Sequence, residues 1–311
     1  MAGRRYLVTG GAGFIGSHLV DALLAAGHEV RVLDDFSTGR RANLESALAS
    51  RKIEIIEADV RETDVVHEAA AGVEGIFHLA ALVSVQQSIE HPQLSFDINV
   101  RGTVNVLEAA RQARIPRVVL ASSAAVYGDT AGPAREEGTP TNPLSPYALD
   151  KLVSEQYAAQ YCRLYGLRAA ALRFFNVYGP RQDPASPYSG VISVFADRIR
   201  QRREVAVYGD GEQTRDFVHV SDVVQANITA MAAPYKGFAS CNVGTGRAVS
   251  INRLLETLSG LVGWQPPIEH SPTRAGDIRH SCADIGRART LLGYAPQRDL
   301  DAGLRELVVT A

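Results

Sequence analysis

A glycine-rich segment near the N-terminus, Thr9–Gly16, leaves few folds open to this chain. It has glycine at positions 10, 13 and 16, directly after an apolar run and directly before an amphipathic stretch. In a strand–loop–helix unit, the first glycine permits a tight turn and the second lets the backbone approach a pyrophosphate. The third lets the helix pack closely on the strand. Because the N–H groups at the helix start then bind the anion, the segment predicts a dinucleotide site in a βαβ fold.

An acidic residue follows this loop at the spacing that dinucleotide sites use. Asp34 ends the second apolar run, about 20 residues further on, where a carboxylate accepts hydrogen bonds from ribose hydroxyls. The same carboxylate would repel a 2′-phosphate, so we expect NAD rather than NADP. Asp59 ends the third run, and its position fits either a contact with adenine or a solvated loop acid.

Short apolar runs alternate with helical patterns through the first half of the chain. The helical patterns are at Ile15–Ala26, Ile98–Gln112 and Ala148–Tyr165. Repeated β-then-α order predicts parallel strands with helices on both faces, hence an α/β fold with a Rossmann-type doubly wound parallel sheet. The expected strands are Tyr6–Thr9, Glu29–Leu33, Ile53–Glu57, Gly75–Leu79, Arg117–Ala121 and Arg168–Leu172.

The pattern becomes less regular after Arg173, where prolines and glycines interrupt the chain. Residues 216–243 again have β-α-β order and are expected to return to the first domain. We therefore predict an NAD-binding domain of residues 1–173 plus 216–243. Residues 174–215 plus 244–311 are predicted to form a smaller α/β substrate-binding domain. Its expected elements are Val191–Gln201, Val205–Tyr208, Ser250–Leu261 and Leu300–Val309.

Composition excludes several classes of partner. The 311 residues include 46% apolar and 21% charged residues, which is ordinary for a folded globular protein of about two domains. A net charge of −2 gives no general reason to bind nucleic acid or an anionic membrane. Three dispersed cysteines suggest neither disulfides nor a metal site, and no apolar run approaches a membrane span. We expect a cytoplasmic protein without a metal.

Three residues in the middle of the chain form a candidate catalytic set. Ser123 lies where the fifth strand ends, and ligands of open α/β sheets bind at that edge. Tyr147 and Lys151 are four residues apart at a helix start and so share a face. A nearby ammonium and a positive nicotinamide would favour the phenolate, which can take a proton from a hydroxyl that Ser123 positions. Such a Tyr–Lys pair alone also fits an exposed helix; its order after the dinucleotide loop favours catalysis.

These segments together resemble the extended short-chain dehydrogenase/reductases, in the branch of the UDP-sugar 4-epimerases. The resemblance covers essentially the whole chain, and its motifs are highly specific for the superfamily and moderately specific for the branch. The segments that carry it are Thr9–Gly16, Leu33–Gly39, His78–Ala81, Ser122–Gly128, Tyr147–Lys151, Arg173–Gly179, Gly209–Asp216 and Arg274–Asp277.

The resemblance implies a cofactor, a substrate and a set of site residues. The cofactor is NAD and the substrate a UDP-sugar, with Ser123, Tyr147 and Lys151 as the catalytic residues. The residues implied around the cofactor, besides Tyr147 and Lys151, are Gly10, Gly13, Phe14, Ile15, Gly16, Asp34, Asp35, Ser37, Thr38, Gly39, Asp59, Val60, Leu79, Ala80 and Ala81.

The implied reaction is epimerisation at the sugar C4. NAD+ removes a hydride from C4 while Tyr147 removes the 4-hydroxyl proton, the 4-keto sugar turns, and the hydride returns to its other face. Related dehydratases and decarboxylases have acidic residues where this chain has Ala124 and Ala125, which disfavours both chemistries. Many epimerases have threonine at the position of Ala125.

The second domain carries the residues implied for the UDP-sugar. Arg215 and Arg274 are suited to a diphosphate, although without the resemblance a surface charge is the favoured reading of each arginine. Asn176 is implied at the same group, Asp277 at the uridine ribose and Tyr208 beside the base. Ser123 also contacts the sugar in this scheme.

Ser281 is the position where the resemblance bears on substrate size. Epimerases restricted to non-acetylated sugars resemble one another in having tyrosine there, whereas those that accept 2-acetamido sugars have a small residue. Ser84, Gln182 and Gly190 match the second group. We therefore expect interconversion of UDP-GlcNAc and UDP-GalNAc, with UDP-Glc and UDP-Gal as further candidate substrates, and a role in polysaccharide synthesis.

Two other readings stay open from the sequence. One is a different NAD-dependent nucleotide-sugar epimerase or a 4-keto-sugar reductase. The other, less favoured because the Ser-Tyr-Lys set is intact, is a dinucleotide-binding protein without catalysis. By analogy with the family we also expect a homodimer, in which the helices at Ile98–Gln112 and Ala148–Tyr165 pair with those of the second copy.

Overall fold

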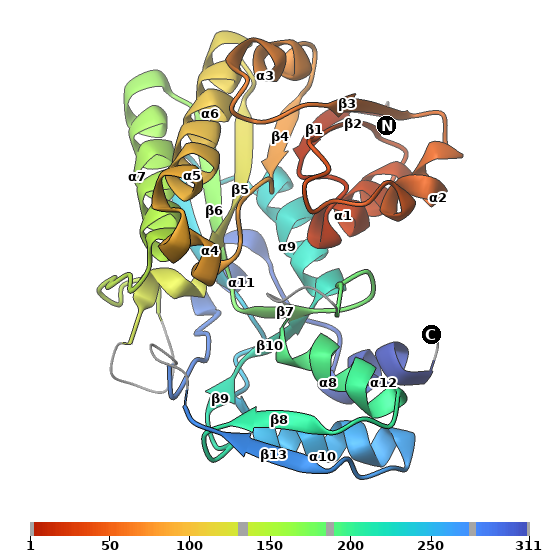
Figure 1. The fold of residues 1–311 in the computed structure, drawn as a ribbon. Coiled ribbons are helices and arrows are strands. Elements are labelled where there is room, and N and C mark those ends of the chain that lie inside the picture. Colours follow the sequence, from red (N-terminus) through yellow and green to blue (C-terminus); the bar gives the residue numbers. More distant parts are fainter. Residues whose placement is uncertain (1–2, 130–135, 185–189, 274–277, 310–311) are drawn as a thin grey trace.

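A seven-stranded parallel sheet forms the centre of the protein (Figure 1). The computed structural model describes residues 3–129, 136–184, 190–273 and 278–309. The strand order is β11-β6-β5-β4-β1-β2-β3, so the chain reverses its direction of travel across the sheet between β1 and β4. The strands are β1 (Arg5–Thr9), β2 (Glu29–Asp34), β3 (Ile53–Glu57), β4 (Gly75–His78), β5 (Arg117–Ser123), β6 (Arg168–Phe174) and β11 (Phe238–Val243).

Helices cover both faces of this sheet. On one face, β-strand residues such as Val8 pack with Leu19 and Val223 of two helices, and on the other face Leu7 packs with Val66 and Ala158. The predicted doubly wound parallel sheet is confirmed. The helices around it are α1 (Phe14–Ala25), α9 (Val220–Ala232) and α11 (Gly286–Leu292) on the first face, and α3 (Thr63–Ala70), α6 (Gly102–Gln112) and α7 (Pro146–Tyr165) on the second.

The sequence defines the start of α7 with three local signals. The side chain of Ser145 caps the helix by accepting a hydrogen bond from the N–H of Ala148 at 3.2 Å. Pro146 stands at the first helical position, where its missing N–H leaves no intrahelical bond unmade. The helix ends before Gly166, which adopts the left-handed conformation at φ 71°. These signals place Tyr147 and Lys151 in the first two turns.

The helix predicted at Ile98–Gln112 begins earlier than expected. A continuous helical segment runs from Pro92, with a wider π-turn at Asp97–Arg101 between α5 and α6. Its first turns are polar apart from two residues, so periodicity did not reveal them. The other elements before β6 that the apolar pattern did not predict are α2 (Glu45–Leu48), α3, α4 (Val85–Glu90), α5 (Pro92–Phe96) and two 3₁₀ turns, η1 (Arg41–Leu44) and η3 (Ala124–Tyr127).

The remaining elements gather around a separate apolar cluster that includes Phe195, Leu254 and Leu304. Figure 1 shows them below the main sheet. The cluster lies between α8 (Val191–Arg200), α10 (Ile251–Val262), α12 (Leu300–Val309) and the pair β8 (Val205–Tyr208) with β13 (Ile268–Ser271). Two further short pairs are β7 (Asn176–Tyr178) with β10 (Phe217–His219) and β9 (Thr214–Arg215) with β12 (Val249–Ser250).

The segment 216–243 divides between these two regions. Its last strand, β11, pairs with β6 at the edge of the main sheet, as the β-α-β order predicts. Its first strand, β10, pairs with β7 instead, because Asn176 and its neighbours offer a parallel partner directly after β6. The domain boundaries at residues 173, 216 and 243 stay a prediction. Among the described helices, none is both long and apolar enough to cross a membrane.

Candidate active site

The glycine loop lies between β1 and α1, at the point where the chain reverses across the sheet. Gly10 has φ +69°, and a Cβ on it would lie 2.6 Å from the N of Ala80. A Cβ on Gly16 would lie 2.0 Å from the O of Gly10, so this glycine is required by helix–loop packing. Gly13 differs, since a Cβ there would meet only the O of Gly10, at 3.2 Å. Space therefore remains beside Gly13, at the N-terminus of α1.

This arrangement fits a dinucleotide pyrophosphate. Gly13 is the N-cap of α1 and provides no capping side chain, so the first N–H groups of the helix have no side-chain acceptor from that residue. Phe14 and Ile15 are half-buried and Gly16 is buried. An anion at this helix start would accept hydrogen bonds from the backbone and be favoured by the helix dipole.

Two alanine variants of the loop separate its structural role from its binding role. We expect Gly16→Ala to lower the thermal stability because the added methyl overlaps the backbone of Gly10. Gly13→Ala should fold with a nearly unchanged melting temperature but lose most of its NAD, because the methyl occupies the open space. Melting curves and the NAD content of both purified variants measure this. Normal NAD content in folded Gly13→Ala would contradict this placement of the pyrophosphate.

The carboxylate of Asp34 holds the turn that follows β2. One of its oxygens accepts from the N–H of Ala12 at 2.8 Å and the other from the N–H of Phe36 at 2.9 Å. Burial raises the pKa of Asp34, and these two hydrogen bonds lower it. A carboxylate has about four acceptor positions, so the buried Asp34 keeps capacity for ribose hydroxyls. A Cβ on Gly39 would lie 2.7 Å from the Oδ1 of Asp34, which explains glycine there.

The other predicted cofactor residues surround this point, with different exposure. Asp35 is exposed and accepts from the hydroxyl of Ser37 at 2.6 Å, and Thr38 is exposed beside it. Leu79, Ala80 and Ala81 follow β4 and are half-buried, and the N–H of Leu79 donates to the carbonyl of Thr9 at 3.0 Å. Their contact with the cofactor stays a prediction.

The carboxylate of Asp59 is paired with the guanidinium group of Arg61. Its carboxylate accepts from Nε and the backbone N–H of Arg61, both at 2.8 Å. Burial raises the pKa of Asp59, but the bonds to Arg61 outweigh it and the net direction is downward. These two bonds leave acceptor positions on the carboxylate, so a contact of Asp59 with adenine stays a prediction beside the reading as a loop acid. Val60 is buried, and its carbonyl accepts from the side chain of Asn105 at 3.0 Å.

Ser123, Tyr147 and Lys151 meet at the carboxyl end of β5. Ser123 ends the strand, and its hydroxyl accepts from the N–H of Ala125 at 3.1 Å. The ammonium of Lys151 is buried, donates to the carbonyl of Ala121 at 3.0 Å and lies 5.9 Å from the centre of the Tyr147 ring. β5 and β1 are parallel, and only β4 lies between them. The three residues therefore lie at the same carboxyl edge of the sheet, where the strands end, as the glycine loop.

The protonation of this set follows from burial. Burial raises the pKa of Tyr147, and a hydrogen bond with Ser123 lowers it. Burial also lowers the pKa of Lys151 to about 8, while the carboxylates of Asp150 and Glu155 raise it. In the protein without cofactor, desolvation is therefore the largest influence on the pKa of Tyr147, and the expected stabilisation of the phenolate by Lys151 does not outweigh it.

Three of the predicted substrate residues that the structure describes lie around β9. Arg215 is in β9 and is half-buried. Ser281 lies directly beside that strand, because its N–H donates to the carbonyl of Thr214 at 3.1 Å. Asn176 is at the start of β7, where its N–H donates to the carbonyl of Asp216 at 3.0 Å. Arg274 and Asp277 lie outside the described residues.

The other predicted substrate residues are less closely grouped. Tyr208 ends β8 and is half-buried, and Gly190 is the N-cap of α8. A Cβ on Gly190 would lie 3.3 Å from the side-chain amide of Gln182, so these two are neighbours. Ser84 is buried, and its hydroxyl caps α4 by accepting from the N–H of Gln87 at 3.0 Å. This cap is a structural role that the sequence did not indicate for Ser84.

Asp216 is a site-forming residue that the sequence reasoning gave no role. It is fully buried, and its carboxylate accepts from the N–H and hydroxyl of Thr245, from the N–H of Gly246 and from the N–H of Ala283. These bonds tie the strand after Arg215 to the chain that carries Ser281. An acid directly before the mainly apolar run Phe217–Val220 was the available signal.

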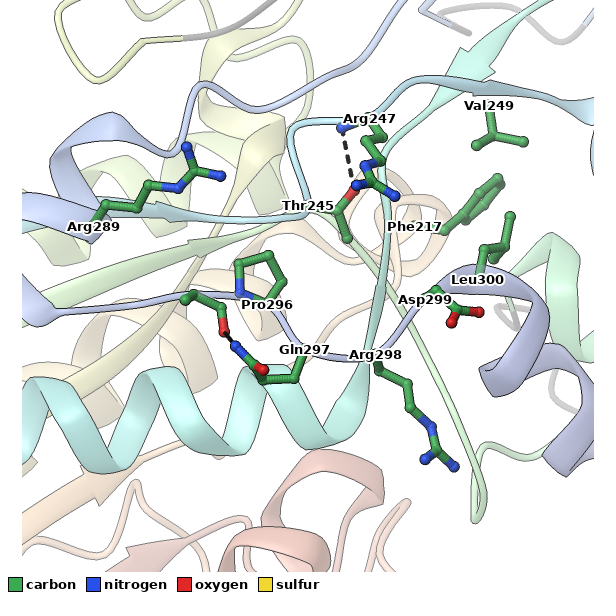
Figure 2. A pocket seen from close by; sticks show the side chains of 11 residues that line it. Phe217, Thr245, Arg247, Val249, Arg289, Pro296, Gln297, Arg298, Asp299 and Leu300 are labelled. Carbon is green, nitrogen blue, oxygen red and sulfur yellow. Dashed lines mark hydrogen bonds between the residues drawn. The ribbon is translucent and has the colours of Figure 1, made fainter.

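A hollow lies beside β9, since its lining residue Val249 pairs with Arg215 (Figure 2). Phe217, Val249 and Leu300 form an apolar side, and the guanidinium groups of Arg247 and Arg289 lie at its rim. None of the predicted site residues lines it.

The model of the NAD-dependent epimerase/dehydratase family matches residues 6–244, which contain the glycine loop, Ser123, Tyr147 and Lys151. The chain belongs to this family. It is similar to the UDP-glucose 4-epimerase of Mycolicibacterium smegmatis, with 44% identity over 98% of this chain and 97% of the relative. The resemblance to extended short-chain dehydrogenase/reductases of the UDP-sugar epimerase branch is thus confirmed, and the cofactor of the family is NAD.

Solved structures agree with this family membership. One is a UDP-N-acetylglucosamine 4-epimerase from Methanobrevibacter ruminantium in complex with UDP-N-acetylmuramic acid. It has a TM-score of 0.95 and 36% identity, covering 99% of this chain and 98% of its own. Another is a UDP-glucose 4-epimerase from Thermus thermophilus in complex with NAD. It has a TM-score of 0.89 and 37% identity, covering 98% and 97%. The fold of this epimerase/dehydratase family member is therefore that of UDP-sugar 4-epimerases.

Proposed function

We propose that this protein is an NAD-dependent C4 epimerase of UDP-sugars that interconverts UDP-GlcNAc and UDP-GalNAc through a 4-keto intermediate. The observation that carries the proposal is the meeting of Ser123, Tyr147 and Lys151 at the sheet edge that also holds the glycine loop. A base, a hydroxyl and an ammonium at that edge are suited to moving one proton beside a dinucleotide.

NAD would be held by the glycine loop at its pyrophosphate and by Asp34 at its ribose. When bound in its oxidised form, it supplies a hydride acceptor and a positive charge beside the phenol of Tyr147. The buried carboxylate of Asp34 would repel a 2′-phosphate, which favours NAD over NADP.

The protein's own part of the reaction is positioning and proton transfer. Ser123 donates its hydroxyl hydrogen to, or accepts from, the sugar 4-hydroxyl and so orients it against Tyr147. Tyr147 accepts the 4-hydroxyl proton as the 4-keto sugar forms and returns it when the sugar is reduced on its other face. The ammonium of Lys151 stabilises the phenolate of Tyr147 before it accepts the proton and again after it returns it, because the two side chains lie on one face of α7.

The residues around the serine support epimerisation over elimination. Ala124 and Ala125 follow Ser123 in the turn η3, and both are half-buried at the same edge. Neither can protonate a leaving hydroxyl or remove a second proton from the sugar. A 4-keto sugar formed beside them therefore has reduction as its available outcome.

The preference for acetylated sugars is supported by the small side chain at Ser281. Ser281 is half-buried beside the strand that carries Arg215, the residue proposed for the diphosphate. A 2-acetamido group needs room that a tyrosine side chain at this position would fill. Gln182 and Gly190, which are neighbours, are proposed on the other side of the acetamide.

Release of the cofactor from denatured protein distinguishes an epimerase from a reductase. An epimerase regenerates its cofactor in each turnover, so we expect purified protein to contain nearly one equivalent of NAD(H). The measurement is the absorbance and enzymatic assay of the supernatant after denaturation. An empty protein that consumes added NADH in proportion to product would instead identify the 4-keto-sugar reductase, and an inert protein a dinucleotide-binding module.

We propose that the protein is a homodimer through the outer side of α4, α5 and α7. The α6 part of the helix predicted at Ile98–Gln112 shows no exposed large apolar residue, and its part in the pairing stays a prediction. The exposed apolar side chains of α4, α5 and α7 include those of Ile89, Leu94, Phe96 and Leu149.

Sedimentation at micromolar concentration should give the mass of two chains. A double change, Phe96→Glu with Leu149→Glu, should give monomers by placing charges on the apolar side chains of both copies. A monomeric wild type, or a variant that stays dimeric, would contradict this interface.

A further inference from the structure

A buried ion pair lies behind the catalytic edge of the sheet. Glu155 in α7 and Arg173 in β6 are both buried and form two parallel bonds, Nε to Oε1 at 2.9 Å and Nη2 to Oε2 at 2.7 Å. A two-pronged arginine–carboxylate contact of this kind fixes orientation as well as distance. Nothing in the proposed proton transfer uses either residue directly.

The pair is connected to both sides of Ser123. The hydroxyl of Ser122, the preceding residue on β5, donates to Oε1 of Glu155 at 2.5 Å. Tyr127, at the end of the turn that follows Ser123, accepts from Nη1 of Arg173 at 2.9 Å. Ser122 and Ser123 face opposite sides of the sheet, so the network holds the serine strand from behind.

The network also extends into the helix and the edge strand. Glu155 is one turn after Lys151 on α7, so the helix carries both the ammonium and the carboxylate. The hydroxyl of Tyr127 donates to Oδ1 of Asn242 in β11 at 2.7 Å. Hydrogen bonds thus connect β5, β6, α7 and β11 close to the catalytic residues.

We propose that Glu155 and Arg173 are positioning residues for catalysis, holding Ser123 through Ser122 and Tyr127 and holding Lys151 through α7. The inference rests on the proposed epimerase function. A buried pair of this kind often adds little net stability, because desolvation of the two charges offsets their attraction. Its hydrogen bonds to the hydroxyls of Ser122 and Tyr127 instead hold the catalytic residues in one defined geometry.

The charge of Glu155 gives the proposal a readout that packing alone would not change. The groups that face Lys151 are Tyr147, Asp150 and Glu155 from α7 and His78 from β4, while β5 contributes the carbonyl of Ala121. The pKa of His78 is lowered to about 3 by burial, so this ring is neutral. Asp150 and Glu155 both raise the pKa of Lys151. Removing the charge of Glu155 therefore lowers that pKa.

The test compares Tyr127→Phe, Ser122→Ala and Glu155→Gln, which keep the shape of the site, with one matched control. Tyr127→Phe and Ser122→Ala each remove a hydroxyl of the network. We expect kcat to fall about tenfold, with KM for the UDP-sugar within about twofold, because misplacement acts on the reacting geometry. Tyr294→Phe is the control, since Tyr294 is as buried as Tyr127 and its hydroxyl bonds to the carbonyl of Gly244 at 2.9 Å. It should leave kcat unchanged.

Glu155→Gln supplies the charge readout. The alkaline limb of the kcat profile should move about one pH unit lower, because Lys151 loses its proton at lower pH. An NMR titration of the Lys151 side chain should move in the same direction, without reference to turnover. Melting curves and NAD content report the fold of each variant, and Ser122→Ala serves if the charge variant does not fold.

The outcomes separate cleanly. Equal kcat in Tyr127→Phe, Ser122→Ala and the Tyr294→Phe control would overturn the proposal, as would an unmoved titration of Lys151 in folded Glu155→Gln. A loss of kcat that only follows the melting temperature in all variants would also overturn it. If the wild type turns over no UDP-sugar, the proposed function fails instead, and the titration of Lys151 still decides whether Glu155 sets that amine.

Discussion

Replacing Tyr147 by phenylalanine should lower kcat by about 1000-fold, which is within the range that a positioned acid–base group contributes. The change removes only the hydroxyl that accepts and returns the proton. The ring still fills its place in the first turn of α7, and the helix keeps its Ser145 cap and Pro146. We therefore expect an unchanged melting temperature and unchanged NAD content. Steady-state rates on each UDP-sugar measure the loss.

The matched control for this variant is Tyr165→Phe. Tyr165 is the last residue of the same helix and is exposed, so losing its hydroxyl should leave kcat as in the wild type. Turnover by Tyr147→Phe within about tenfold of the wild type would be too high for loss of the base. Another residue would then have to move the proton.

Replacing Ser281 by tyrosine should lower kcat/KM for UDP-GlcNAc and UDP-GalNAc by about 100-fold, while UDP-Glc and UDP-Gal lose little. The phenol would fill the space proposed for the acetamide. Ser281 is half-buried and is held at its backbone N–H by Thr214, so the larger side chain can be added without removing that bond.

Ser281→Ala is the companion variant, because it keeps the small volume and removes the hydroxyl. It should keep the acetylated substrates, which would assign the effect of tyrosine to volume. Equal losses on both sugar types in Ser281→Tyr would mean that this residue does not select the substrate. Measurement of kcat/KM for all four UDP-sugars on one preparation decides between these results.

The strands of the main sheet were predictable because their residues are apolar and continuous. Other strand ends differ by at most one residue, but two differ by two residues for one reason: β5 continues to Ser123 and β6 to Phe174, beyond the predicted ends at Ala121 and Leu172. Ser122 and Arg173 look like strand ends in a hydropathy pattern. Each is buried because it bonds to Glu155, and this partner lies in a different part of the sequence.

The meeting of Ser123, Tyr147 and Lys151 was predictable because these residues lie in short motifs at fixed spacing. The supporting residues were not, since Glu155, Asn242 and Asp216 have partners far along the chain. The role of Ser84 was also hidden, because a helix cap and a ligand contact call for the same hydroxyl. Asp59 shows the reverse case, where the residue two positions later already supplies its cation.

The most direct measurement of the central claim is the equilibration of each UDP-sugar at C4. Purified wild-type protein is incubated separately with UDP-GlcNAc, UDP-GalNAc, UDP-Glc and UDP-Gal, without added cofactor, and the C4 epimers are separated and quantified. We expect both acetylated sugars to converge on one mixture of the two epimers, with no net consumption of NAD(H). Absence of any C4 epimer from the acetylated sugars, with the protein folded and its NAD present, would contradict the proposed function.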